Sequence, residues 1–351
     1  MHVKTLFLFL ILLFSIFPAN LEPIFASEDL LIHVRHISKD IGPRQGGSKE
    51  EEMTAQYIAS QFRKNGIKTE IQKFKYYSLN SEGIKTSQNV VGTIEGISDK
   101  EIIICADLDT VKDFASANYT EGANDDATGL AVLIGLAEKY KCKKPLFTIK
   151  LIACGASEDG FTFPLVTPKR TELSADSYYK INYIPYMVGA RQYVLSNQQN
   201  LNKTLAVLSI EAVGIGNPYF VSRDYYTEND PFFINFLVLN AKMHGIGAEK
   251  IDFMASKLPL GQEAAISHIY LPFSIAKIPS TFITCMNNPD NSGIHDTTNC
   301  MPNYLSVDDT YENLVKENMN EELLREHLED VLDMVDASIN GISYLNSWQL
   351  F

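Results

Sequence analysis

The feature of this 351-residue sequence that most constrains its fold is the acidic segment 121–129, Glu-Gly-Ala-Asn-Asp-Asp-Ala-Thr-Gly. It places two adjacent aspartates between a glycine turn and the start of an amphipathic segment. Just upstream, the apolar run 101–105 is typical of a buried strand and is followed by Asp107 and Asp109. We expect the two groups of carboxylates to meet at the carboxyl edge of one sheet, where open α/β proteins place their chemistry. Such an edge is a good place to hold a cation.

Strand-like runs recur along the chain, and the later ones alternate with helical segments. Strands are predicted at 69–74, 89–94, 101–105, 147–154, 205–210 and 280–285. Helical periodicity is found at 30–37, 51–65, 130–140, 189–196, 231–243 and 321–345. The pattern predicts a single α/β domain over 27–351, in which a mixed, mostly parallel β-sheet is flanked by helices.

The first residues have the order of a secretory signal peptide. Lys4 precedes an apolar run at 6–14 that continues through Ile16 and Phe17, Pro18 and small residues follow, and we expect cleavage after Ala26 to remove 1–26. The run is shorter than the ~20 residues that span a bilayer, although an uncleaved anchor is the alternative. We therefore expect a secreted or periplasmic protein with no stable membrane span after cleavage. In such a protein Cys285 and Cys300 could form a disulfide.

Charge limits the partners of the protein. The net charge of −13 argues against binding to nucleic acid, which needs clustered lysine and arginine. A metal ion or a cationic amine is a more suitable ligand for this acidic protein than nucleic acid. The tyrosine-rich stretch 161–187 has no clear period and is either a surface excursion or a wall of a substrate pocket. The sequence does not indicate an oligomeric state.

Candidate site residues follow the ends of predicted strands and are therefore expected to converge. One imidazole with several carboxylates suits zinc or a harder divalent ion. Asp125 could instead cap a helix, and Asp107 and Glu211 could be surface carboxylates. His268 is expected to orient its neighbours through hydrogen bonds. The candidates are Asp107, Asp109, Asp125, Asp126, Ser157, Glu158, Glu211 and His295.

Several motifs, in this order and spacing, resemble those of metallopeptidase family 28, which comprises zinc aminopeptidases, carboxypeptidase-like relatives and glutaminyl cyclases. The resemblance runs through most of the mature chain and implies the zinc-exopeptidase (phosphorylase/hydrolase-like) architecture. The motifs are Gly-Pro-Arg at 42–44 with Gly-Ser at 47–48, Gly-Ala-Asn-Asp-Asp-Ala-Thr-Gly at 122–129, Gly-Ala-Arg-Gln-Tyr at 189–193, Ser-His at 267–268 with Pro-Phe at 272–273, and Ile-Pro at 278–279.

The resemblance implies one intact metal site and one altered site. Asp125 matches the carboxylate that bridges two zinc ions, and Glu158 and His295 complete the zinc site. Where the family has His-x-Asp this chain has Asp107-Leu108-Asp109, and Glu211 stands in place of an aspartate. A second ion at Asp107 and Glu211 could be zinc, but the exchange of nitrogen for oxygen favours calcium, magnesium or manganese.

The resemblance also identifies a missing base. Ser157 stands where the family has a glutamate that takes a proton from the metal-bound water. A hydroxyl cannot do so near neutral pH, and loss of a general base commonly costs ~100-fold to 10,000-fold in rate. By the same resemblance, Asp109 is expected to be a second catalytic residue beside position 157.

Three hypotheses follow. The first is an exported exopeptidase that hydrolyses peptide bonds at an amino terminus with metal-activated water, slowly because of Ser157. The second is a catalytically inactive metal-binding homologue that serves as a binding module. The third is an acyl transferase similar to glutaminyl cyclase, which needs one zinc ion but also relies on the missing glutamate.

Overall fold

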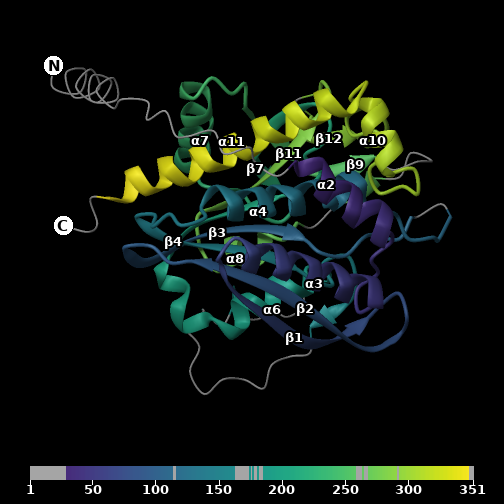
Figure 1. Ribbon diagram of the computed structural model, residues 1–351, viewed down its shortest axis with the longest axis horizontal. Helices are drawn as coiled ribbons and strands as arrows, with labels where there is room; N and C mark the ends of the chain where they lie inside the picture. Colours follow the sequence, from purple (N-terminus) through teal and green to yellow (C-terminus); the bar gives the residue numbers. More distant parts are fainter. Residues whose placement is uncertain are drawn as a thin grey trace.

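The computed structural model describes residues 29–113, 116–162, 174, 176–177, 180–181, 185–257, 263–264, 268–290 and 292–347. The predicted signal peptide and most of the tyrosine-rich stretch 161–187 lie outside these residues. Within the described residues, helices pack on both faces of one large sheet (Figure 1). None of the described helices is long and apolar enough to cross a membrane.

The large sheet is mixed, and its central strands are parallel. Its order is β5-β1-β2-β4-β3-β6-β11-β7-β8, in which β4, β3, β6 and β11 run parallel to one another. A three-stranded sheet of order β10-β9-β12 lies beside it. The strands are β1 (Lys68–Ser78), β2 (Gly83–Ile94), β3 (Ser98–Asp107), β4 (Phe147–Cys154), β5 (Phe161–Thr162), β6 (Thr204–Ile210), β7 (Asn217–Asp224), β8 (Glu249–Phe253), β9 (Ala255–Lys257), β10 (Glu263–Ala264), β11 (Ser280–Met286) and β12 (Ile294–Asp296).

Two sets of helices cover the two faces of the large sheet. Helices α2 (Leu30–Arg35), α3 (Lys49–Lys64), α4 (Thr128–Lys139), α7 (Pro231–Met243) and α11 (Glu321–Asn346) share one hydrophobic core with the strands. Helices α6 (Val188–Ser196) and α8 (Leu271–Ile275) share a core on the other face. The remaining helical segments are η1 (His36–Ile41), η2 (Ala123–Ala127), η3 (Gln198–Lys203), α9 (Thr297–Cys300) and α10 (Tyr311–Glu317).

Alternation along β3 explains how one strand supplies both cores. Ile102 and Ile104 belong to the core under α4, whereas Ile103 and Cys105 belong to the core under α6. Successive side chains of a strand point to opposite faces of the sheet, so a strand buried on both faces reads as a continuous apolar run.

The six predicted strands and six predicted helices are confirmed, with ends that differ by a few residues. Residues 42–48 separate the first helices, and the Ser48 hydroxyl caps α3 by accepting from the Glu51 N–H at 3.1 Å. The suggested disulfide is absent, because Cys285 and Cys300 are both free and buried. The Cys300 thiol instead donates to the carbonyl of Asp296 at 3.0 Å.

The register of the parallel strands determines which residues lie side by side at the carboxyl edge of the sheet. Cys105 of β3 pairs with Ser209 of β6. Asp107 and Glu211 lie two residues further along each strand, so they are side by side at the carboxyl edge. The segment that leaves β4 carries Ser157 and Glu158 to the same edge, because Asp107 pairs with Cys154.

We predict that the contact between α3 and β2 makes a large contribution to stability. Phe62 is fully buried, and a Cβ added at Gly92 would lie 2.8 Å from its ring. The Phe62→Ala variant should lower the free energy of unfolding by about 3–5 kcal/mol, because the cavity cannot fully close. The control is Met53→Ala on the exposed side of α3, which should change it by less than about 0.5 kcal/mol. Equal effects in urea unfolding would contradict this packing.

Candidate active site

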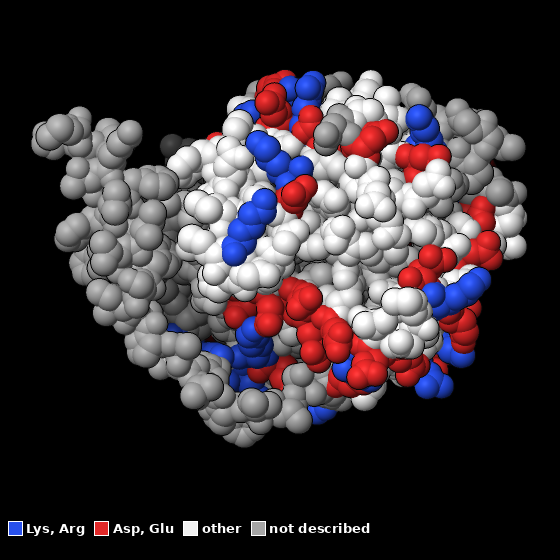
Figure 2. All heavy atoms as spheres, turned by 90° about the horizontal axis from the view of Figure 1, so that it is seen from above, with Lys and Arg blue, Asp and Glu red and all other residues white. Residues whose placement is uncertain are grey.

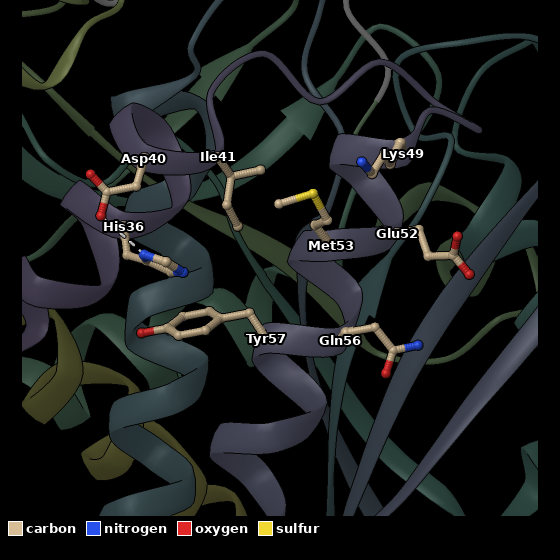
Figure 3. Close-up of a pocket in the computed structure, with 8 residues that line it drawn as sticks. All are labelled: His36, Asp40, Ile41, Lys49, Glu52, Met53, Gln56 and Tyr57. Atoms are coloured by element: carbon tan, nitrogen blue, oxygen red, sulfur yellow. Dashed lines mark hydrogen bonds and ion pairs between the residues drawn. The ribbon is translucent and has the colours of Figure 1, made fainter.

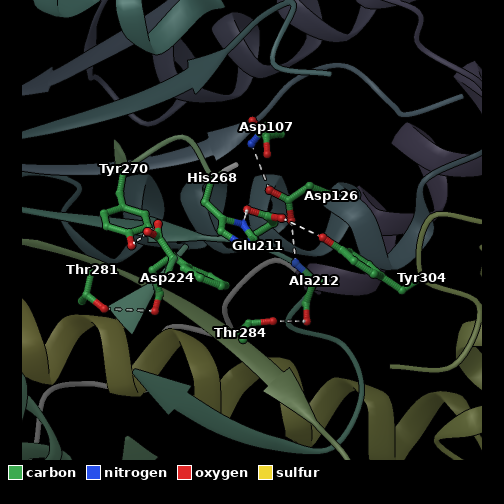
Figure 4. Close-up of polar contacts among 11 residues, drawn as sticks. Asp107, Asp126, Glu211, Ala212, Asp224, His268, Tyr270, Thr281, Thr284 and Tyr304 are labelled. Carbon is green, nitrogen blue, oxygen red and sulfur yellow. Dashed lines mark hydrogen bonds and ion pairs between the residues drawn. The ribbon is translucent and has the colours of Figure 1, made fainter. Parts of the chain in front are cut away.

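The two acidic segments meet at the carboxyl edge of the sheet, as the sequence predicted. Asp126 joins them, because one carboxylate oxygen accepts from the main-chain N–H of Asp107 at 3.0 Å. Its other oxygen accepts from the N–H groups of Gly129 at 3.1 Å and Ala212 at 3.3 Å (Figure 4). Asp126 therefore fixes the ends of β3 and β6 and the first turn of α4 relative to one another.

Asp125 is buried beside Asp126 but has a different environment. Its Oδ2 atom has no hydrogen-bond partner among the described residues. The sequence allowed Asp125 to cap the following helix, and this reading is wrong, because Asp126 accepts from the Gly129 N–H in that role. A buried oxygen without a donor costs free energy unless a cation or a donor compensates it. Asp125 therefore keeps the properties of a ligand.

Asp309 holds the main chain at Asp125 in place. Its two carboxylate oxygens accept from the N–H groups of Asn124 at 2.7 Å and Asp125 at 3.0 Å. The Asn124 side-chain oxygen in turn accepts from the N–H of Gly214 at 2.7 Å. The segment that carries Asp125 is thus fixed from both sides by groups far away in the sequence.

Arg44 is a fully buried guanidinium at the centre of this edge. It donates to five main-chain carbonyls, those of Ile37, Gly42, Leu108, Glu121 and Gly122, at 2.6–3.3 Å. Burial lowers the pKa of Arg44 to about 10, against the opposing effect of nearby aspartates led by Asp309. Arg44 therefore stays charged at neutral pH and ties the acidic segment to β3.

Asp109 positions the segment that carries Ser157 and Glu158. Its carboxylate oxygens accept from the N–H groups of Ser157 at 2.6 Å and Glu158 at 3.2 Å. We expected Asp109 to be at a catalytic position. In the structure its carboxylate orients the main chain at Ser157 and Glu158. Glu158 is partly exposed, whereas Asp109 is buried.

The Ser157 hydroxyl donates to the carbonyl of Cys154 at 3.1 Å. Asp159, the nearest possible substitute for a base, is engaged elsewhere. It accepts from the hydroxyls of Tyr76 and Ser78 and from the N–H groups of Leu79 and Asn80. The Asp159 carboxylate is thus held by β1 and the turn that follows it.

Glu211 lies beside Asp107 and is bonded on both oxygens. Its Oε2 atom lies 2.7 Å from Nδ1 of His268, and its Oε1 atom accepts from the Tyr304 hydroxyl at 3.0 Å (Figure 4). All three side chains are buried. The expectation that His268 orients a neighbour by a hydrogen bond is confirmed, and that neighbour is Glu211.

His295 comes from β12 of the small sheet. Its Nε2 atom lies 2.8 Å from the carbonyl oxygen of Asp252, and its ring lies 5.1 Å from that of Phe253. The Phe253 ring also contacts His268 at 5.4 Å. The two histidines therefore lie against the same aromatic side chain.

Burial makes this edge electrostatically unfavourable for negative charge. Burial raises the pKa of Asp107, Asp125 and Glu158 well above the usual range, and neighbouring carboxylates raise it further. Glu211 is the carboxylate that contributes most at Asp107 and Asp125. A bound cation would reverse this effect, because an opposite charge favours the ionised form.

Two surface features lie apart from the cluster. A hollow between η1 and α3 is lined by residues such as His36, Met53 and Tyr57 (Figure 3), none of which belongs to the carboxylate cluster. On the face shown in Figure 2, acidic side chains form a band with scattered basic ones. Among the described residues of that face there is no continuous basic surface of the kind that binds nucleic acid.

The family model for peptidase family M28 matches residues 89–321, which include every candidate ligand described above. The chain belongs to peptidase family M28. The family and its zinc aminopeptidase neighbours support a zinc-dependent, exopeptidase-like function and a peptide substrate. The predicted fold class is confirmed by the same comparison.

The solved structures that this M28 protein resembles include an aminopeptidase and a glutaminyl cyclase, the two enzyme classes considered from the sequence. A segment of 141 residues is 30% identical to the alkaline phosphatase isozyme conversion protein of Escherichia coli (strain K12) and covers 36% of this chain and 41% of that relative. A glutaminyl cyclase of Bacteroides thetaiotaomicron is 21% identical, with a TM-score of 0.64 over 90% of this chain and 98% of its own. A zinc aminopeptidase of Bacillus subtilis is 15% identical, with a TM-score of 0.64 over 91% of this chain and 95% of its own. The structural likenesses show the fold.

The described residues of this M28 protein include donor atoms of the types that bind a cation, but they are not arranged as a metal site in this structure. Among the described residues, no three His, Cys, Asp or Glu side chains are arranged to hold a metal ion by themselves. Yet Asp107 Oδ1, Asp125 Oδ2 and His295 Nδ1 are buried without hydrogen-bond partners in the described residues. Because carboxylates repel one another, a cation is what would let their oxygens converge. Asp125, Glu158 and His295 remain the predicted zinc ligands, and Asp107 and Glu211 the predicted ligands of a second ion.

Sequence reasoning missed the residues that build this site from outside the motifs. Asp309 and Tyr304 follow no pattern in the sequence. Glu51 is fully buried. In the sequence it stands between Glu50 and Glu52 in the first turn of α3, where acidic residues are common, so the sequence does not distinguish it from its neighbours. It accepts four hydrogen bonds, from Gly47 N at 2.7 Å, Ser87 Oγ at 2.6 Å, Gln88 Nε2 at 3.1 Å and Ala156 N at 3.0 Å.

We predict a pH dependence of stability from Glu51. Burial raises its pKa from 4.5 to about 7, and its hydrogen bonds oppose this only in part. The native state therefore holds a proton that the unfolded chain releases. The resulting stabilisation is complete below pH 4.5 and is lost as the pH rises through 7. Relative to Glu51→Gln, the free energy of unfolding of the wild type should fall by about 3 kcal/mol across this window.

Urea unfolding at several pH values measures this effect. Glu52→Gln, an exposed neighbour on the same helix, is the matched control and should follow the wild type. If Glu51→Gln also follows the wild type, the buried Glu51 carboxyl is not the group that titrates.

Proposed function

We propose that this protein is a metal-dependent exopeptidase that acts at the amino terminus of peptides and is slow because Ser157 replaces the base. The observation that carries the proposal is the buried Asp125, whose Oδ2 atom has no donor among the described residues, next to Glu158 at the carboxyl edge of the sheet. His295, whose Nδ1 atom has no partner within the described part of the chain, would complete the site. These three side chains would hold zinc.

A bound zinc ion supplies Lewis-acid polarisation of a carbonyl group and lowers the pKa of a water molecule. The chain supplies the rest. Asp109 fixes the main chain at Ser157 and Glu158, and Asp309 fixes it at Asp125. The surrounding carboxylates favour a cationic amine, such as the free amino terminus of a peptide. What the chain lacks is a side chain at 157 that can accept a proton.

The identity of Ser157 favours a second candidate function, a metal-binding homologue without catalysis. The Ser157 hydroxyl is itself a donor to the Cys154 carbonyl, and Asp159 is occupied by four other groups. A cyclising acyl transferase ranks below both, because the same proton transfer is missing there.

We predict that Ser157→Glu increases turnover. The glutamate restores a general base, so kcat for an aminoacyl reporter substrate should rise by ~100-fold to 10,000-fold. Ser157→Gln is the matched control, because it has the same size and no basic carboxylate, and it should not gain activity. An amino-acetylated reporter should not be cleaved if the enzyme requires a free amino terminus.

The same preparations separate the alternatives. Metal analysis of the wild type should find bound zinc, and a protein without metal would contradict the proposal. Zinc with no turnover in the wild type, and with turnover in Ser157→Glu, would select the non-catalytic homologue. Release of a cyclised product from a glutaminyl reporter would select the acyl transferase.

We also propose that the protein is exported. The support is the apolar run at 6–14 behind Lys4, with Pro18 and Ala19 after it and the small residue Ala26 at the expected cleavage point. The predicted result is a mature protein that begins at Ser27, measured by mass spectrometry of protein from the extracytoplasmic fraction. An intact amino terminus on cytoplasmic protein would contradict export.

A further inference from the structure

Helix α7 is apolar on its outer face as well as on its inner face. Its inner side chains, Ile234 and Leu237 among them, are buried in the core. On the outer face Phe232 is 67% exposed, Leu239 is 53% exposed and Met243 is 51% exposed. A helix that is apolar on all sides is ordinarily buried on all sides. The outer face of α7 is therefore suited to cover by another surface.

The apolar side chains of the outer face form one stripe. Phe232, Phe236, Leu239 and Met243 follow one another at intervals of four, three and four residues, and the helical period places them on one side of α7. Phe236 is half-buried and packs against the core at the edge of the stripe. The stripe is about 16 Å long, because a helix rises 1.5 Å per residue. We call these four residues the α7 stripe.

The end of α11 lies beside the first turn of α7. The Asn240 side chain donates to the carbonyl of Ala337 at 2.7 Å, and residues 245–247 line one hollow together with Val331. The two helices therefore run antiparallel, side by side at the periphery of the molecule (Figure 1). This register brings Tyr344, which is 37% exposed, level with the start of the α7 stripe.

The charge of the protein limits what can cover the α7 stripe. A net charge of −13 repels an anionic membrane, and helices that bind membranes carry several lysines and arginines. The only charged residue within α7 is Lys242. Two copies of so acidic a protein also repel each other over most of their surfaces, so they can associate only through a face with little charge. The α7 stripe is such a face.

The ends of α7 make the α7 stripe complementary to a second copy in one orientation. Asp230 caps the first turn by accepting from the Phe232 N–H at 2.9 Å, and Lys242 lies in the last turn. Both are exposed. In an antiparallel pair of α7 helices, Asp230 approaches the partner's Lys242 and the helix dipoles oppose each other. In a parallel pair the two lysines meet and repel.

Antiparallel packing also matches the side chains of the α7 stripe. With the two-fold axis midway between Phe236 and Leu239, Phe236 faces the partner's Leu239. Phe232 faces the partner's Met243 in the same way. Each aromatic ring then meets an aliphatic side chain, and contacts between methionine sulfur and an aromatic ring are favourable.

We propose that the protein forms a two-fold symmetric dimer in which the α7 stripes of two copies pack antiparallel. A two-fold interface uses the same patch on both subunits, and the α7 stripe with its oppositely charged ends meets this requirement. The apolar centre with aromatic side chains and the charged rim are the usual arrangement of an interface between subunits. The proposal is independent of the peptidase activity.

Sedimentation velocity of the purified protein over a range of concentrations tests the dimer. The wild type should sediment as a dimer at micromolar concentration and dissociate on dilution. Leu239→Asp should raise the dissociation constant by at least ~10-fold to 100-fold, because it buries a charge at the centre of the interface. The matched control is Ile97→Asp, an equally exposed apolar position in the turn between β2 and β3, and its dissociation constant should equal that of the wild type.

A pair of variants tests the antiparallel register. Phe232→Glu and Met243→Lys change exposed positions and should each weaken the dimer by ~10-fold or more. An equimolar mixture should form heterodimers more tightly than either variant forms homodimers. In the mixture one Glu faces one Lys across the interface, and the second Phe232–Met243 contact is unchanged. Unfolding in urea should be the same for both variants as for the wild type measured as a monomer at high dilution.

The other occupants of the α7 stripe are distinguished by the same measurements. A wild type that is monomeric at every concentration would overturn the proposal, whether the α7 stripe then binds lipid vesicles or nothing. Equal dissociation in Leu239→Asp and Ile97→Asp, or a dimer that Leu239→Asp leaves intact, would place the interface elsewhere and overturn it as well. A mixture of Phe232→Glu and Met243→Lys that gains no affinity would overturn the antiparallel arrangement.

Discussion

The structure depends on how buried negative charge is compensated at the carboxyl edge of the sheet. Asp107, Asp125 and Asp126 are all buried, and buried carboxylates are costly unless they are paired, hydrogen-bonded or bound to a cation. Main-chain N–H groups compensate Asp126, and the Arg44 guanidinium supplies a fixed positive charge. Asp107 Oδ1 and Asp125 Oδ2 have no hydrogen-bond partner among the described residues, so a cation nearby would compensate them.

Several buried carboxylates near the site hold the main chain in place. Asp109, Asp309 and Glu51 all accept main-chain hydrogen bonds and fix the segments that carry Asp125 and Glu158. This framework is intact in a chain that has serine at 157. The hydrogen bonds that hold the main chain at Asp125 and Glu158 do not depend on the side chain at 157.

The sequence predicted the elements that are buried on both faces and the residues at their ends. Apolar runs identified β3, β4, β6 and β11, and the parallel order of these strands brings Asp107, Glu158 and Glu211 together. The sequence did not predict β7 and β8, because Pro218 and several charged residues break their pattern. It also did not distinguish Asp125 from Asp126, since only the three-dimensional structure shows which of the two the main chain uses. Glu51, Tyr304 and Asp309 act through contacts distant in sequence, which no local pattern records.

Anomalous scattering from crystals of the zinc-loaded protein tests the central claim most directly, because it locates each ion without reference to activity. The account predicts a zinc peak among Asp125, Glu158 and His295. A map with no zinc peak at the carboxyl edge of β3, β4 and β6 would contradict it.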